Sequence, residues 1–288
     1  MASTVVVPSL SPSRRRFAPS PRHRQVIAKL VRVLGAKLLA IAIVLIVWQS
    51  VYLSGWKSSS VLPSPAVVFA SLWRQMHEPV LWHAIETTMG RAVLGFGVAV
   101  LLGTGIGLLV SANRLIGSGF GPIIAAVQAM PAIAWFPFAI IFFGLNTAAI
   151  VFVIVIGAAP SVATGVTSGI NHIPPLLVRA SQTMGLRGIA LYRHLVLPAA
   201  LPMVVSGLKQ GWAFAWRSLM AGELLVIVAN TPSIGVLLNN AQNLSDMPSA
   251  MAIMIVILTA GMVIDALLSQ VDKAIRRRWG LTSQEEAV

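Results

Sequence analysis

Long blocks of apolar residues, separated by short polar segments, run through the chain from about residue 38 onward. A helix needs about 20 mostly apolar residues to cross a membrane, and a helix satisfies its own backbone hydrogen bonds in lipid. The pattern therefore predicts six spanning helices, at residues 38–53, 91–112, 120–143, 148–168, 199–229 and 250–268. The predicted fold class is an all-α membrane protein.

The composition supports a membrane protein over a soluble one. Of the 288 residues, 57% are hydrophobic and only 10% are charged, whereas a soluble domain has about 25% charged residues. The chain has no cysteine, which excludes disulfides and thiolate metal sites, and its five histidines are scattered. We therefore expect no metal and no cofactor.

The net charge of +13 raises the question of a nucleic-acid partner, but the placement of the charges answers it. Sixteen of the 21 Lys and Arg residues fall in residues 1–37, 112–119, 169–198 and 269–288, whereas the intervening outside segments hold only Lys57 and Arg74. Positive loops lie on the cytoplasmic side. Both termini are therefore predicted to be cytoplasmic, and the excess charge is explained by orientation and by anionic lipid.

The predicted organisation has four parts. Residues 1–32, rich in Pro, Ser and Arg, form a flexible basic cytoplasmic tail; residues 33–60 hold the first spanning helix; residues 61–272 form the core; and residues 273–288 form a second basic tail. Within the core, Ser64 can cap a helix and Pro65 suits a first helical turn. A short outer helix is therefore predicted after Pro65, over residues 67–73.

Small residues recur every four positions in two of the predicted spans. The first series is Gly95, Ala99, Gly103, Gly107 and Ser111, and the second is Gly207, Gly211 and Ala215. Helices associate in lipid through small residues that allow close approach. Both series are therefore interpreted as helix-packing faces.

The fifth span also carries a polar stripe that could border a path for a solute. On an ideal helix, Lys209, Trp212, Trp216 and Glu223 lie within about 60° of one another. Charges at membrane depth usually face a protein interior or a wet cavity, but Trp and Lys also anchor helices at the headgroups. Both interpretations of the stripe remain open.

The third and fourth spans contain prolines, which remove helix hydrogen bonds. Broken helices often border a path or a hinge, although a proline kink without a function is an equal alternative. Pro131, Pro137 and Pro160 lie at these positions. Gln128 and Trp135 flank the first two, so Gln128, Pro131 and Trp135 join the candidate path residues.

Residues 169–198 form the least lipid-like internal segment. Apolar residues at 176, 177, 180 and 184 have the spacing of one helical face, and Gly185 suits a left-handed helix end. A second short helix is expected over residues 188–195, before Leu197-Pro198. An exposed apolar face on such a projection indicates a docking partner, unless it lies flat on the lipid surface.

This loop resembles the "EAA" loop of ATP-binding-cassette (ABC) importer permeases. In that family Glu-Ala-Ala is followed after three residues by Gly, and later by an aliphatic residue and Leu-Pro. Here Arg179 and Ser181 stand at the Glu and second Ala positions, while the spacing from Gly185 to Leu197-Pro198 is met. The matching coupling residues are Arg179, Ala180, Ser181, Met184, Gly185, Leu186, Arg187, Leu195, Leu197 and Pro198.

Other stretches are similar to the aliphatic sulfonate/taurine/nitrate permease group. They are Leu62-Pro63-Ser64-Pro65, then Thr88 with Arg91, Pro131 to Pro137, and Ala221-Gly222-Glu223. The resemblance implies a multi-pass permease of the bacterial inner membrane, acting as a homodimer with cytoplasmic ATPase subunits and an external binding protein. The chain lacks a phosphate-binding Gly-x-x-x-x-Gly-Lys-Ser/Thr loop, so ATP hydrolysis is expected on a separate chain and no catalytic residue is assigned.

The expected function is therefore passage of a small anionic solute of the sulfonate, taurine or nitrate type. One alternative is another solute, such as a quaternary amine or a thiamine precursor, because related permeases share most of these features. A second is a stand-alone secondary transporter, suggested by the intramembrane charges of Lys209, Arg217 and Glu223. The loop and the absence of evident inverted repeats argue against it.

Overall fold

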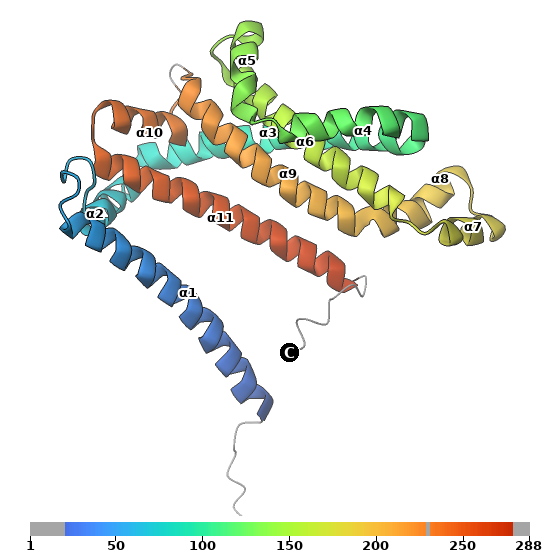
Figure 1. Ribbon diagram of the computed structural model, residues 1–288, viewed down its shortest axis with the longest axis horizontal. Coiled ribbons are helices and arrows are strands. Elements are labelled where there is room, and N and C mark those ends of the chain that lie inside the picture. Colours follow the sequence, from blue (N-terminus) through green and yellow to red (C-terminus); the bar gives the residue numbers. More distant parts are fainter. Residues whose placement is uncertain (1–20, 229–230, 279–288) are drawn as a thin grey trace, which may run out of the picture. The chain divides into compact units, whose positions relative to one another are not determined.

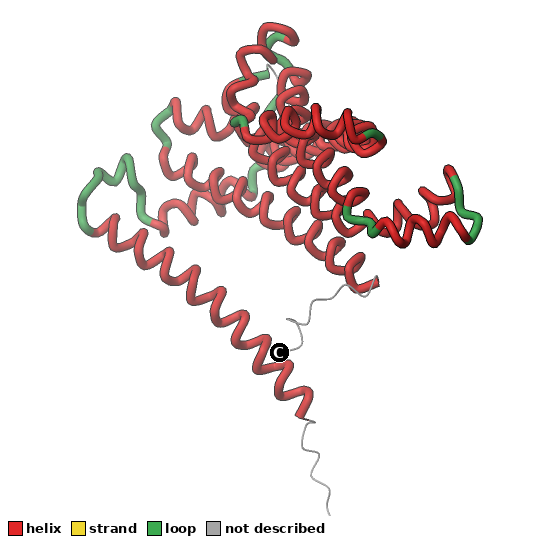
Figure 2. Tube along the Cα trace, turned by 45° about the vertical axis from the view of Figure 1, so that its right-hand side comes forward, coloured by secondary structure: helices red, strands yellow, loops and turns green. Residues whose placement is uncertain are grey.

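The computed structural model of the chain describes residues 21–228 and 231–278. Within these ranges the chain forms helices joined by turns, with no strand (Figure 2). The predicted all-α class is confirmed. The chain divides into two units, residues 1–57 and residues 58–288.

The first unit contains one helix, α1 (Pro21–Leu53). Its part from Gly35 to Leu53 is long and apolar enough to cross a membrane, as predicted for the first span. Leu38, Val44 and Ile46 are all exposed, as side chains that face lipid must be. Residues 21–32, predicted as part of a flexible tail, are helical here, and residues 1–20 lie outside the described part.

The second unit is a bundle whose long helices run between two different ends (Figure 1). The short helices α2 and α10 lie at one end, and α7 and α8 lie at the other. In chain order the elements are α2 (Pro65–Met76), α3 (Pro79–Ala112), α4 (Arg114–Ala129), the 3₁₀ turn η1 (Ala132–Trp135), α5 (Phe136–Phe143), α6 (Thr147–Asn171), α7 (Pro175–Thr183), α8 (Gly188–Leu191), the π-helical turn η2 (Tyr192–Val196), α9 (Leu197–Leu225), α10 (Ile234–Asn243) and α11 (Met247–Arg278).

Five helical stretches of the described residues are long and apolar enough to span a membrane, and the bent pair formed by α4 with η1 and α5 makes a sixth candidate. The predicted number of spans therefore agrees with the structure. The third span is not one straight helix, because α4 and the segment formed by η1 and α5 are bent by 99° relative to each other. The predicted outer helix is present as α2, and the Oγ of Ser64 accepts a hydrogen bond from the N–H of Val67.

Helix α6 lies between α3 and α9, and both predicted small-residue series contact it. A Cβ added at Gly103 would lie 2.7 Å from the Cβ of Val162, and one added at Gly207 would lie 2.6 Å from the Cα of Gly165. Neither position has room for a side chain. The close approach of α3, α6 and α9 therefore depends on glycine, as the series predicted.

Four predicted boundaries differ from the structure. The third span begins with α4 at Arg114 rather than at residue 120. The second span begins at Pro79 rather than at residue 91, because His83, Glu86 and Thr87 lower the local hydropathy without interrupting the helix. The fifth ends at Leu225 rather than at residue 229. The last helix extends to Arg278, well beyond residue 268, so residues 273–278, predicted as part of a tail, are helical.

Two further features differ from the sequence-based expectation. Pro160 does not break its span, since α6 runs continuously through it and Pro160 is buried; neighbouring helices on both sides stabilise a proline in such a position. Helix α10 was not predicted at all. Its ten residues are too few to span a membrane, and they include the polar Asn239, Asn240 and Gln242.

A pair of substitutions on one face and the opposite face of α3 tests this packing. We expect Gly103→Ala to lower stability by about 1–3 kcal/mol, the usual cost of overpacking. The matched control is Gly105→Ala, where an added Cβ meets nothing within 4 Å, and which we expect to leave stability unchanged or slightly raised. The measurement is thermal unfolding of the purified protein in detergent, and equal effects of the two substitutions would contradict the packing role.

Candidate functional site

The loop predicted to bind a partner is built around a tight helix end. Helix α7 stops where Gly185 adopts a φ of +91°. The N–H of Leu186 donates to the carbonyl of Ser181 at 3.0 Å, and the N–H of Gly185 donates to that of Gln182 at 3.1 Å. This pair of bonds is the Schellman motif, in which a left-handed residue satisfies the last carbonyls of a helix. The predicted role of Gly185 as a left-handed helix end is confirmed.

The predicted coupling residues divide into an outward set and an inward set. Arg179, Ala180, Met184, Gly185, Arg187 and Leu197 are exposed, whereas Leu186, Leu195 and Pro198 are half-buried. Ser181 is buried, and its Oγ donates to the carbonyl of Leu177 at 2.6 Å. The Ser181 side chain is therefore paired within α7, whereas the Arg179 side chain is exposed on the surface of that helix.

The second part of the loop is continuous with a long helix. Helices α8 and α9 are joined through η2, and together they form one helical stretch from Gly188 to Leu225. Pro198 lies just after the π-helical turn η2, so the stretch runs through a residue that lacks an N–H donor. Helix α8 therefore leads into α9 without an intervening non-helical residue.

The stripe predicted on the fifth span faces other helices of the same chain. Lys209 Nζ lies 4.0 Å from Asp265 Oδ1 of α11, and the ring of Trp212 meets that of Phe96 of α3 edge-on at 5.2 Å. Trp216 packs on Gly261 of α11, where an added Cβ would lie 2.8 Å from its Nε1. These three side chains hold α9 against its neighbours.

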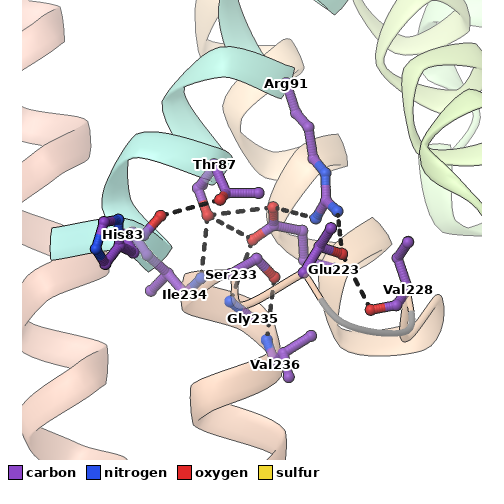
Figure 3. Close-up of polar contacts among 11 residues, drawn as sticks. His83, Thr87, Arg91, Glu223, Val228, Ser233, Ile234, Gly235 and Val236 are labelled. Atoms are coloured by element: carbon purple, nitrogen blue, oxygen red, sulfur yellow. Dashed lines mark hydrogen bonds and ion pairs between the residues drawn. The ribbon is translucent and has the colours of Figure 1, made fainter. Parts of the chain in front are cut away.

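Glu223 ends the stripe in a fully buried polar cluster (Figure 3). One carboxylate oxygen lies 2.9 Å from Nη1 of Arg91, and the hydroxyl of Thr88 donates to the carboxylate at 2.9 Å. The other oxygen accepts the N–H of Gly235 at 3.1 Å, in the first turn of α10. The positive end of that helix also favours the carboxylate.

The same cluster fixes the connection between α9 and α10. The second guanidinium nitrogen of Arg91, Nη2, donates to the Oγ1 of Thr231 at 3.2 Å, and Thr88 Oγ1 accepts the N–H of Ile234 at 3.0 Å. Gly235 contacts Glu223 so closely that a Cβ there would collide with the Glu223 side chain. The cluster therefore joins α3, the end of α9 and the start of α10.

Sequence reasoning did not assign Arg91 a site role. It was placed at the beginning of a span, so it could be counted as a boundary residue. Helix α3 in fact begins twelve residues earlier, and Arg91 is only 5% exposed. An ionisable residue inside a membrane helix needs a partner, and that rule applied to a longer span would have marked Arg91 as a residue that must be paired, without naming Glu223 as its partner.

The remaining candidate path residues lie at the bend of the third span. Gln128 is in the last turn of α4, and its Oε1 lies 3.4 Å from Thr164 Oγ1 of α6. Pro131 is exposed beyond the end of α4. Within the described part of the chain, two buried polar atoms have no hydrogen-bond partner: Trp135 Nε1 in this bend and Ser161 Oγ in α6. The bend therefore carries an unpaired donor inside the membrane domain.

The described residues contain no group of three His, Cys, Asp or Glu side chains that could hold a metal ion. The buried Arg91 and Glu223 form an ion pair with each other.

The ion pair can be tested with a double-mutant cycle. We expect Arg91→Met to destabilise the protein by about 3–5 kcal/mol, because it leaves the Glu223 carboxylate buried without a countercharge. Adding Glu223→Gln should recover much of that loss, since the neutral amide still accepts the N–H of Gly235. Thermal unfolding in detergent is measured for Arg91→Met, for Glu223→Gln and for the double variant. A double variant whose loss of stability equals the sum of the losses in the two single variants would be the contrary result.

Comparison with known proteins shows the family of this helical bundle. Residues 92–279 match the family described as binding-protein-dependent transport system inner membrane component. The taurine transport system permease protein of Escherichia coli strain K12 is 26% identical over 206 residues, which cover 70% of this chain and 74% of the relative. The nitrate import permease protein of Synechocystis sp. is 25% identical and the match covers 82% of this chain and 87% of the relative.

A solved structure agrees on the fold. A chain of the MetNI methionine ABC transporter in an inward-facing conformation superposes with a TM-score of 0.58 at 18% identity, covering 69% of this chain and 98% of that one. The family match extends over most of the bundle, from within α3 to the end of α11. The chain therefore belongs to the family of binding-protein-dependent transport system inner membrane components, and it is a permease subunit of an ABC importer, not an enzyme.

Proposed function

We propose that residues 174–198, here called the coupling segment, dock on a cytoplasmic ATPase subunit and pass its motion to the membrane helices. The observation that carries this proposal is the continuous helix from Gly188 to Leu225. The segment projects at the end of the unit opposite α2 and α10 (Figure 1), so a partner can reach it. Exposed apolar side chains on such a projection support a protein contact.

In the proposed cycle, ATP binding closes a pair of ATPase subunits and moves two coupling segments together. Each segment turns its α9, and α9 carries α3 and α6 because glycine contacts join the three helices. Solute enters from an external binding protein while the bundle is open outward. ATP hydrolysis then resets the inward-open state. Two copies of this chain, as a homodimer, complete the proposed assembly.

The proposed path follows the bend of the third span, along Gln128, Pro131 and Trp135. Irregular backbone at membrane depth is stable where it lines a cavity or is buried in protein. The unpaired indole N–H of Trp135 can donate a hydrogen bond to a solute anion in an open state. The remaining candidate path residues hold α9 in position beside this path through their contacts with α3 and α11. They are Lys209, Trp212, Trp216 and Glu223.

The proposed solute is a small anion of the aliphatic sulfonate, taurine or nitrate type. Support comes from the taurine and nitrate permeases, whose similarity covers most of this chain. A quaternary amine or a thiamine precursor is the second candidate, motivated by the sequence features that such permeases share with this group.

A substitution at the end of α7 tests the coupling role. We expect Gly185→Val to abolish solute-stimulated ATPase activity while membrane insertion stays normal, because a β-branched residue is strained at a φ of +91°. Gly185→Asn is the matched control, since Asn tolerates this conformation and should keep most of the activity. Neither change is limited by space, because a Cβ at residue 185 meets nothing within 4 Å. Full coupling in Gly185→Val would contradict the assignment.

The solute class is tested by reconstituting the permease with the ATPase and binding protein encoded beside it. We expect ATP-dependent uptake of labelled taurine, an alkanesulfonate or nitrate into proteoliposomes, and no uptake without the ATPase. ATP-dependent uptake of choline or a thiamine precursor instead would replace the anion with the second candidate. Uptake by this chain alone, driven by an ion gradient, would contradict the proposed assembly.

A further inference from the structure

The coupling segment has an unusual charge distribution. It contains Arg179, Arg187 and Arg193 and no acidic residue, and the nearest acids along the chain are Glu86 and Glu223. All three arginines are exposed, and none forms an ion pair within the part of the chain that the structure describes. The surface of the segment is therefore cationic without compensation.

Apolar side chains lie among these arginines. Leu176 and Met184 are each 75% exposed, Leu177 is 47% exposed and Ile189 is 86% exposed. Leu176 and Arg179 are three residues apart on α7, so they share one helical face. The segment thus presents large apolar groups and guanidinium groups side by side.

We propose that this surface binds a groove of the ATPase subunit that is apolar at its floor and carries carboxylates facing Arg179 and Arg187. This inference rests on the proposed docking of the coupling segment and specifies the chemistry of its partner. In the "EAA" pattern the position of Arg179 is a glutamate, so this chain carries the opposite charge at that position. Arginine suits such a contact because its planar guanidinium can bind a carboxylate with two parallel hydrogen bonds.

A phospholipid surface would also attract three arginines, but the shape of the segment favours a protein groove. Helices that lie on lipid bury one continuous apolar face and keep their cations on the other. Here the apolar side chains are divided between α7, the turn at Met184 and α8, and α7 and α8 have only nine and four residues. The Schellman turn at Gly185 holds these pieces in a fixed arrangement.

The test measures the affinity of the detergent-solubilised permease for the ATPase encoded beside it. We expect Arg179→Glu to weaken binding about tenfold or more at low salt, and Arg179→Lys to weaken it much less, because an acidic groove repels the reversed charge. The difference should shrink as ionic strength rises. Arg74→Glu is the matched control, since Arg74 is exposed on α2 at the opposite end of the unit, and it should leave the affinity unchanged.

A second variant makes the test independent of local misfolding. Crosslinking from residue 179 first identifies the ATPase carboxylate that faces it. Replacing that ATPase residue with lysine should restore the affinity of the Arg179→Glu permease. If wild-type ATPase binds but Arg179→Glu binds equally well, the acidic groove is wrong and the docking role stands. If no ATPase binds the wild-type permease, both fail. If Arg179→Glu loses affinity only for vesicles containing phosphatidylglycerol, the partner is lipid and the inference is overturned.

Discussion

The close approach of α3, α6 and α9 is the contact on which the rest of the bundle depends. Lipid gives helices no hydrophobic reason to associate, so contact must come from packing at short range. Glycines at positions such as Gly103 and Gly207 let the backbones of α3 and α9 lie directly against α6 on its two sides. These contacts leave no room for a side chain between the helices.

This rigid core lies between two polar ends with different chemistry. At one end, the Arg91–Glu223 pair and the N–H of Gly235 join α3, the end of α9 and the start of α10. At the other, the coupling segment is exposed, cationic and continuous with α9. The polar groups of the first end are paired within the chain, whereas the three arginines of the other end are exposed and form no ion pair among the described residues.

Features governed by local rules were predictable. The cap at Ser64, the left-handed turn at Gly185 and the small-residue faces all follow from a few neighbouring residues, and the structure contains each of them. Features governed by average hydropathy were less certain. The start of α3 was placed twelve residues late, and α10 was missed, because short or mixed-polarity helices do not stand out from a hydropathy pattern.

The sequence by itself determined the class of the protein, its number of spans and the helix and turn that end at Gly185, because lipid and local backbone chemistry impose those patterns residue by residue. Only the tertiary structure decided what the charged residues do. Arg91 and Glu223 are 132 residues apart, and no periodicity along the chain pairs them. Their assignment required knowing which faces of α3 and α9 meet at the same depth, and packing between distant segments decides that.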